Sequence, residues 1–216
     1  MPKQNRVTPF STLIAASARG TLTGNRGCLH DDHEQIRRQF RGQRWIICLL
    51  DFKGRKRSIM TPGRYTELFF LDEATALAAG HRPCAECQRA RFNHFREIWA
   101  KSNPEAIKEA RPAATAMDAI LHQERTVTTI QSRRFCNSVG DLPDGTFVTD
   151  DEHHAYLVLR RLLLQWSPAG YECPRKRDIN LPLRVVTPAS LVRTLGAGYP
   201  VSIHCSALQA IGRSSY

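Results

Sequence analysis

Cys84 and Cys87 are the two residues whose types and spacing most directly indicate chemistry. Two cysteines separated by two residues can direct both sulfurs at one cation, which is half of a tetrahedral thiolate site. Such a pair can also be redox-active, or it can be two thiols buried in a core. A thioredoxin-like pair is expected between a strand and the start of a helix, whereas this pair follows a helical pattern and Gly80. The spacing therefore predicts a zinc knuckle.

The remaining zinc ligands must come from elsewhere in the chain, because a structural zinc ion takes four ligands and a catalytic one takes three with an open position. The candidates upstream of the pair are Cys28, His30, His33 and Cys48. Cys48 lies in a β-prone segment that can fold back beside the pair, although a free cysteine there can equally be a small core residue. His30 is preferred to Cys28 because the two aspartates that follow it could orient its imidazole ring. The expected ligand set is Cys84, Cys87, Cys48 and His30.

Residues 71–89, LDEATALAAGHRPCAECQR, resemble the second half of the zinc-binding domain of Ada-type DNA alkylation-repair proteins. In that family an acidic, alanine-rich helix leads into a Gly-x-Arg-Pro-Cys-x-x-Cys knuckle that supplies two of the four zinc thiolates. The resemblance implies a zinc fold at Cys84 and Cys87 and an association with nucleic acid. The other ligand pair of the family has the spacing Cys-x-x-x-Cys, which does not occur in this sequence. That difference argues against the alkyl-accepting chemistry of the family, for which Cys48 would be the nucleophile.

The charge of the chain also bears on its partners. It has 31 lysine and arginine residues against 20 aspartate and glutamate residues, a formal net charge of +11. Arginine supplies most of the positive charge, and its guanidinium suits bidentate contacts with phosphate. This balance predicts binding to DNA or RNA, although a positive surplus can also serve solubility alone. The residues expected to contact nucleic acid are Arg55, Lys56, Arg57, Arg64, Arg82 and Arg89.

A second group of residues, Asp118, His122 and Glu124, suggests acid–base chemistry. Asp118 and His122 are four residues apart in a helical pattern, so they share one face of the helix. A carboxylate beside an imidazole can form a general base, but the same pair is also common on helix surfaces. The alternative to a nucleic-acid-binding protein is therefore a zinc-dependent hydrolase or nucleic-acid-processing enzyme. It would use an open metal position with these three candidates as its catalytic residues.

Several other classes of protein are disfavoured by the sequence. Seven cysteines are scattered along 216 residues, unlike the dense and even pattern of a disulfide framework. We therefore expect reduced thiols and a cytoplasmic protein. No apolar run approaches the roughly 18 residues of a membrane helix, so no membrane partner is expected. The sequence contains no P-loop, dinucleotide-binding glycine motif, Gly-x-Ser-x-Gly or His-Glu-x-x-His.

The elements that must position these residues predict an α+β fold. Residues 1–105 are expected to form an Ada-like zinc-binding domain of short strands, a hairpin and helices, and residues 106–216 an α+β domain with a small antiparallel sheet. The two halves can also be one continuous domain. In the first half we expect a strand at 45–52 that forms a hairpin with 57–60 around a cationic tip, and a strand at 65–71. Helices are expected at 72–79, closed by Gly80, and at 85–101.

The second half is expected to be rich in β-structure. A helical stretch over 104–125, interrupted at Arg111-Pro112, leads into it. Strands are expected at 146–149, 155–160, 162–166 and 183–186. A final helix is expected to start at Thr187-Pro188 and to end at Gly196, because threonine caps helix starts and proline is favoured in the first turn.

Overall fold

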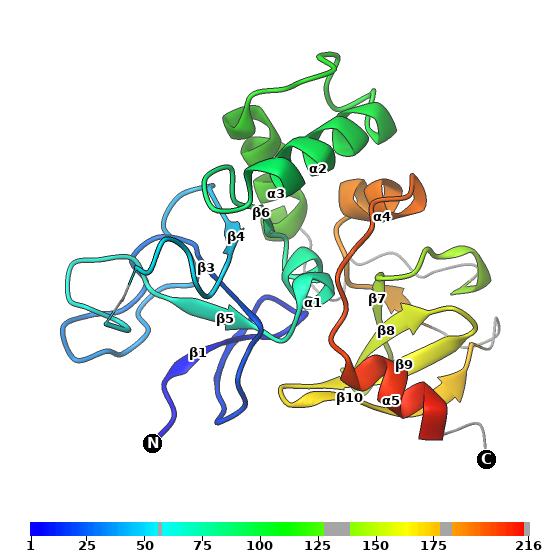
Figure 1. Cartoon of the computed structure of the whole chain (residues 1–216), viewed down its shortest axis with the longest axis horizontal. Coiled ribbons are helices and arrows are strands. Elements are labelled where there is room, and N and C mark those ends of the chain that lie inside the picture. Colours follow the sequence, from blue (N-terminus) through cyan, green and yellow to red (C-terminus); the bar gives the residue numbers. More distant parts are fainter. Residues whose placement is uncertain (56–57, 128–138, 178–182, 214–216) are drawn as a thin grey trace.

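The computed structural model describes residues 1–55, 58–127, 139–177 and 183–213. The chain has an α+β fold, with a mixed six-stranded sheet and helices in its N-terminal part and an antiparallel five-stranded sheet in its C-terminal part (Figure 1). The prediction of the α+β class is confirmed.

The N-terminal sheet is built from short strands that lie far apart in the sequence. They are β1 (Gln4–Val7), β2 (Leu13–Ala15), β3 (Leu22–Asn25), β4 (Ile46–Cys48), β5 (Leu68–Phe70) and β6 (Arg82–Pro83), in the spatial order β2-β1-β5-β3-β4-β6. The β1–β5 and β4–β6 pairs are parallel, and the other pairs are antiparallel. The β4–β6 pair matters most for function, because β4 ends at Cys48 and β6 immediately precedes Cys84.

The predicted hairpin between 45–52 and 57–60 is wrong. The strand ends at Cys48, its partners are β3 and β6, and residues 49–55 and 58–64 contain no strand. The backbone explains this, because Lys53, Gly54 and Met60 take left-handed conformations with φ of 55°, 62° and 59°, which interrupt an extended chain. Lys56 and Arg57, at the predicted cationic tip, lie outside the described residues.

Between β5 and the C-terminal sheet, the described residues form three α-helices. Helix α1 (Glu73–Ala78) is capped by the Asp72 carboxylate, which accepts from the N–H of Thr75, and Gly80 ends this turn of chain at a φ of 81°, as predicted. Helix α2 (Arg89–Ser102) starts later than predicted because residues 84–88 form the turns of the knuckle. Helix α3 (Ala114–Val127) covers only the second half of the predicted 104–125 stretch, which contains Pro104 and Pro112.

The C-terminal sheet is an antiparallel meander with one added edge strand. Its members are β7 (Phe147–Thr149), β8 (Ala155–Leu159), β9 (Leu162–Ser167), β10 (Gly170–Lys176) and β11 (Arg184–Val185), in the order β10-β9-β8-β7-β11. A 3₁₀ turn at Val139–Asp141 precedes it, and helices α4 (Ala189–Gly196) and α5 (Ser206–Arg213) follow it. The four predicted strands and the helix ending at Gly196 are confirmed, whereas β10 and α5 were not predicted. Thr187 does not cap this helix as predicted, because the N-cap residue is Pro188 and the Thr187 hydroxyl accepts the N–H of Phe147 instead.

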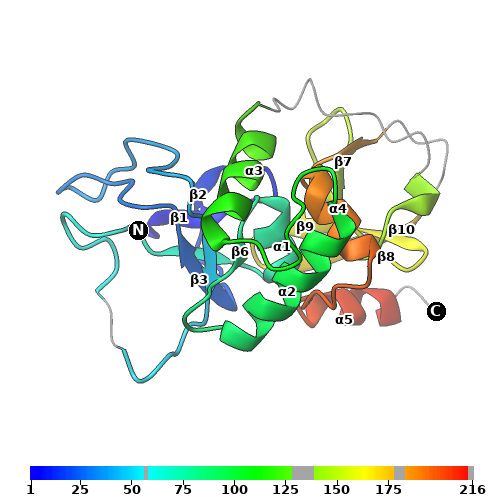
Figure 2. The ribbon, with the colours of Figure 1, turned by 90° about the horizontal axis from the view of Figure 1, so that it is seen from above.

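Helix α1 lies between the two sheets and is buried along its whole length (Figure 1). Its residues Ala74 and Ala78 pack with the C-terminal sheet, while Ala76 and Leu77 pack with the N-terminal core. The predicted boundary between residues 105 and 106 falls between α2 and α3, and α4 from beyond that boundary packs alongside α2 (Figure 2). The hydrophobic packing therefore continues from one part of the chain into the other.

Candidate metal centre

The sulfur atoms of Cys48, Cys84 and Cys87 come together in one group, within 4.8 Å of one another. A zinc ion with Zn–S bonds of about 2.3 Å in tetrahedral geometry would separate its sulfurs by about 3.8 Å. The group therefore fits a zinc ion with small adjustments, and its soft thiolate donors match the preference of zinc. The structure brings Cys48 to the Cys84–Cys87 pair, as expected from the sequence.

Pairing between β4 and β6 places these cysteines. Ile47 lies opposite Pro83 in the parallel ladder. The carbonyl of Ile47 accepts the backbone N–H of Cys84 at 2.9 Å and the side-chain amide of Gln88, also at 2.9 Å. One carbonyl next to Cys48 thus holds both ends of the knuckle. Gln88, which follows Cys87 directly, was not singled out in the sequence.

Backbone N–H groups point at the sulfurs. The N–H of Glu86 donates to the Cys84 sulfur at 3.4 Å, and the N–H of Leu49 donates to the Cys87 sulfur. Such N–H donors stabilise thiolates, which are the form of cysteine that binds metal. The loop geometry is therefore suited to negative charge on sulfur before any metal arrives.

The three sulfurs share that negative charge unequally. The Cys48 thiol donates to Cys84, and this contact lowers the pKa of Cys84 to about 5. The same contact, with burial and the neighbouring sulfurs, raises the pKa of Cys48, and burial raises the pKa of Cys87. Without a cation the group favours one thiolate and two thiols. A bound cation would favour the thiolate form of all three.

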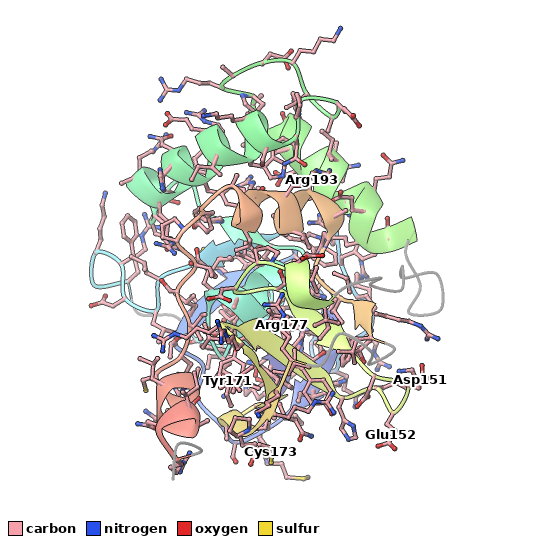
Figure 3. The ribbon with its side chains drawn as sticks, turned by 90° about the vertical axis from the view of Figure 1, so that its right-hand side faces the viewer. Asp151, Glu152, Tyr171, Cys173, Arg177 and Arg193 are labelled. Carbon is pink, nitrogen blue, oxygen red and sulfur yellow. The ribbon has the colours of Figure 1, made fainter. Side chains whose placement is uncertain are left out.

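The cysteine group lies just beneath the surface. Cys48 and Cys84 are buried, whereas Cys87 is only partly buried. Leu49, Leu50 and Glu86, next to the ligands in the chain, are exposed. Other cysteines lie elsewhere: Cys173 is exposed on the edge strand β10 (Figure 3), and Cys205 is exposed before α5. Cys136 lies outside the described residues.

The predicted fourth ligand, His30, is not part of this group. Its Nδ1 pairs with the Thr66 hydroxyl at 2.6 Å, and its Nε2 pairs with the Thr61 carbonyl at 3.1 Å. Thr66 also accepts the N–H of Leu29, so these contacts fasten the chain after β3 to the segment before β5. His30 is therefore left out of the ligand set. In the described part of the chain, the three cysteines are the one group of this kind.

The three acid–base candidates on α3 make separate contacts instead of forming one site. Both oxygens of Asp118 accept from the Arg82 guanidinium, at 2.8 and 2.7 Å. The His122 ring packs edge-on against Phe40, with ring centroids 4.9 Å apart. The Glu124 carboxylate accepts the N–H and the hydroxyl of Ser190, at 2.9 and 2.5 Å, at the start of α4. Asp118 and Glu124 thus hold the fold together.

The arginines predicted to contact nucleic acid fall into different environments. Arg82 is a correction to the sequence analysis, because it is 2% exposed and its charge is paired with Asp118, so its guanidinium does not face a ligand at the surface. Arg64 and Arg89 are exposed. Arg55 is also exposed and donates to Glu86, inside the knuckle, at 2.7 Å. Arg55 is thus tied to the knuckle through Glu86, and Arg89 follows Cys87 by two residues.

Comparison with known proteins adds no relative: no family model, no curated protein and no solved structure matches this chain. The resemblance of residues 71–89 to the Ada zinc domain therefore stays a prediction from the sequence. Among the described residues, no helix is long and apolar enough to cross a membrane.

Proposed function

We propose that this chain binds zinc through Cys48, Cys84 and Cys87, and that the basic surface beside this centre associates with nucleic acid. The observation that carries the proposal is the convergence of three sulfurs from separate segments, with N–H donors directed at two of them. The resemblance of residues 71–89 to the Ada family supports both parts of the proposal, zinc and nucleic acid.

The surface around the knuckle supports a polyanionic partner. Arg55 contacts Glu86 between the two cysteines of the knuckle, and Arg89 is exposed two residues after Cys87. Lys53 is exposed in the loop that follows β4. The ion pair of Arg55 with Glu86 is exposed on both sides, and exposed pairs of this kind contribute at most about 1 kcal/mol. Arg55 can therefore exchange Glu86 for a phosphate at little cost.

The number of sulfurs favours a second candidate function. A zinc ion held by three protein ligands keeps one position for another donor, whereas a structural site is closed by four. The three-cysteine group thus supports a zinc-dependent hydrolase or nucleic-acid-processing enzyme as the alternative. The chain's own contribution would be to hold the ion and to bring a phosphate to it through Arg55 and Arg89. This candidate requires metal-dependent cleavage of DNA or RNA, lost in Cys84→Ser; a zinc-loaded protein that cleaves neither leaves the binding function alone.

Metal content tests the first part of the proposal. Elemental analysis should find one zinc ion per chain in the wild-type protein and in Cys173→Ser, an exposed cysteine on β10 that serves as the matched control. Cys48→Ser and Cys84→Ser should lose most of the metal. Wild-type protein purified without zinc, or full zinc retention in Cys84→Ser, would overturn the assignment.

Salt-dependent binding tests the second part. Fluorescence anisotropy with labelled DNA and RNA oligonucleotides should show affinity that falls steeply with salt, since each phosphate contact contributes about 0.7–0.9 to the slope of log K against log salt. The double variant Arg55→Ala with Arg89→Ala should reduce that slope. The control pair Arg161→Ala and Arg213→Ala removes the same charge from exposed positions in the C-terminal part. Equal effects of the two pairs would contradict a contact surface beside the knuckle.

A further inference from the structure

A second basic feature lies away from the cysteines, in the segment 37–44 (RRQFRGQR), which carries four arginines in eight residues. This segment borders a cavity of about 400 Å³, which we call the arginine cavity. The residues that line it are Asn25, Gly27, Arg41, Gly42, Gln43, Arg44, Thr115 and Asp118. Arg41 and Arg44 are exposed, so the cavity opens to solvent between cationic side chains.

The backbone that carries these arginines is held in place. The N–H of Arg41 donates to the Arg26 carbonyl at 2.7 Å, and the Trp45 indole donates to the Gly42 carbonyl at 3.2 Å. Gly27 has a φ of 96°, and a Cβ atom there would lie 2.5 Å from the Arg41 carbonyl oxygen, so only glycine allows this close approach. A cavity that is already formed loses little entropy when it binds a ligand.

Two further arginines adjoin residues that line the arginine cavity, since Arg26 is next to Asn25 and Gly27 in the chain and Arg125 donates to the Gln43 carbonyl. Arg26 is fully buried and stacks on Trp45, 4.1 Å from the ring centroid. Arg125 stacks on the same ring at 3.9 Å. Among the described residues, Nη2 of Arg26 and Nε of Arg125 have no hydrogen-bond partner. Burial lowers the pKa of both guanidiniums to about 9, so both keep their charge at neutral pH.

The carboxylates near this cavity do not balance its arginines. Asp118 lines the cavity, but both of its oxygens accept from Arg82. Of the ion pairs that the described residues form, none joins a carboxylate to Arg26, Arg41, Arg44 or Arg125. Unpaired charge in or beside a protein interior is costly, and an anion held at the cavity would offset that cost.

We propose that the arginine cavity binds a phosphate of a nucleic-acid strand, as a contact surface separate from the cysteine group. Arg41 and Arg44 would take the phosphate oxygens, since guanidinium forms bidentate contacts with phosphate. Phe40, 37% exposed and adjacent to Arg41, offers an aromatic ring on which an unpaired base can stack. This assignment rests on the proposed association with nucleic acid and adds a second contact surface to the one beside the cysteines.

The test compares the full-length zinc-loaded protein with two double variants of equal charge. The first, Arg41→Ala with Arg44→Ala, removes both arginines that line the cavity and is called the rim variant. The second, Arg161→Ala with Arg213→Ala, is the control and changes exposed positions on the β8–β9 turn and α5. Anisotropy of a labelled single-stranded oligonucleotide is measured between about 50 and 200 mM salt. The rim variant should raise Kd on the order of tenfold and reduce the salt slope by about 2. The control should change Kd by less than about twofold.

Each outcome decides a different question. If wild-type protein binds the oligonucleotide and both double variants weaken this binding equally, binding depends on net charge alone and the cavity assignment is overturned.

If wild-type protein binds no DNA or RNA, the proposed function fails, and inorganic phosphate then tests the cavity by itself. Phosphate should raise Tm above chloride at equal ionic strength in wild-type protein and not in the rim variant. A rise without strand binding would identify a free-phosphate site, and the absence of any rise would remove the cavity as an anion site. Phe40→Leu should lower the affinity for the single-stranded oligonucleotide and leave phosphate binding unchanged.

Discussion

Asp118→Ala should destabilise this protein more than any loss of an exposed carboxylate. The Arg82 guanidinium donates to both oxygens of Asp118, and the two side chains are 2% and 5% exposed. Alanine at position 118 would leave the arginine charge buried without a counter-charge, which costs about 3–5 kcal/mol. Since 1 kcal/mol shifts Tm by about 2–4 °C for a chain of this size, Tm should fall by roughly 6–20 °C.

The same substitution should weaken zinc binding, because Arg82 belongs to the strand that carries the knuckle. Its N–H donates to the Trp45 carbonyl at 3.2 Å within the β4–β6 pair, and Cys84 follows two residues later. A purely catalytic role for Asp118 predicts something different, namely lost activity with little change in stability. Stability is therefore the measurement that separates a structural carboxylate from a general base.

Urea denaturation followed by tryptophan fluorescence provides the assay, with Arg82→Met and the double variant completing a thermodynamic cycle. The double variant removes both charges and should be more stable than Asp118→Ala alone. Asp32→Ala, an exposed aspartate, is the control and should change the unfolding free energy by less than about 0.5 kcal/mol. A loss of less than about 1 kcal/mol in Asp118→Ala, or strictly additive effects in the double variant, would refute the reasoning.

Three further outcomes are expected. The pKa of His81 is held well below its ordinary value by burial and then by Arg26 and Arg125, so the unfolded chain takes up a proton that the folded chain does not. Stability should thus fall as pH drops below about 6.5, by up to about 1.4 kcal/mol per pH unit, and urea midpoints of His81→Phe should lack this slope. EDTA should lower the Tm of wild-type protein and leave the Tm of Cys84→Ser unchanged. If free zinc was a thousandfold above Kd, removing it should lower the unfolding free energy of wild-type protein by about 4 kcal/mol. Glu124→Ala should cost about 1–2 kcal/mol in chemical denaturation, because it removes the acceptor for Ser190 at the start of α4, whereas Gln123→Ala, at an exposed neighbouring position, should not.

Local signals allowed the knuckle to be predicted from the sequence. Gly80 as the end of the helix and the Cys84–Cys87 spacing each act within a few residues. The inclusion of Cys48 followed from its place in a strand before the knuckle, although that strand pairs with β3 and β6 rather than in the expected hairpin. The cysteine group was thus predicted correctly through a partly wrong topology.

Contacts between distant residues explain what the sequence could not reveal. The partner of His30 is Thr66, and the partner of Arg82 is Asp118, each 36 residues away. Asp31, one of the two aspartates expected to orient His30, instead accepts the N–H groups of His33 and Gln35 in a local turn. Because the sequence does not show these pairings, a buried structural histidine cannot be told from a metal ligand there, nor a buried arginine from a surface cation.

Strand β10 was missed for a different reason. It contains Pro174, and proline argues against a strand unless it lies at an edge or a bulge. Here both conditions hold, because β10 is an edge strand and its register with β9 shifts between Glu172 and Arg175. Cys173, within this shift, has a φ of 47°. The irregularity accommodates the proline, and no residue pattern marked it in advance.

Strand β4 connects the two proposed sites. Arg44 lines the arginine cavity just before β4, and Cys48 ends the strand at the metal centre. Four residues of extended chain span about 13 Å, which is within the reach of a few nucleotides of one strand. A nucleic-acid strand bound at the cavity could therefore also reach the cysteine group and the exposed Arg55 and Arg89. Because β4 pairs on both sides, with β3 and β6, the sheet fixes the part of this spacing that β4 spans. Zinc would strengthen this arrangement by joining the end of β4 to the start of the knuckle, so the metal can support nucleic-acid binding without touching the nucleic acid itself.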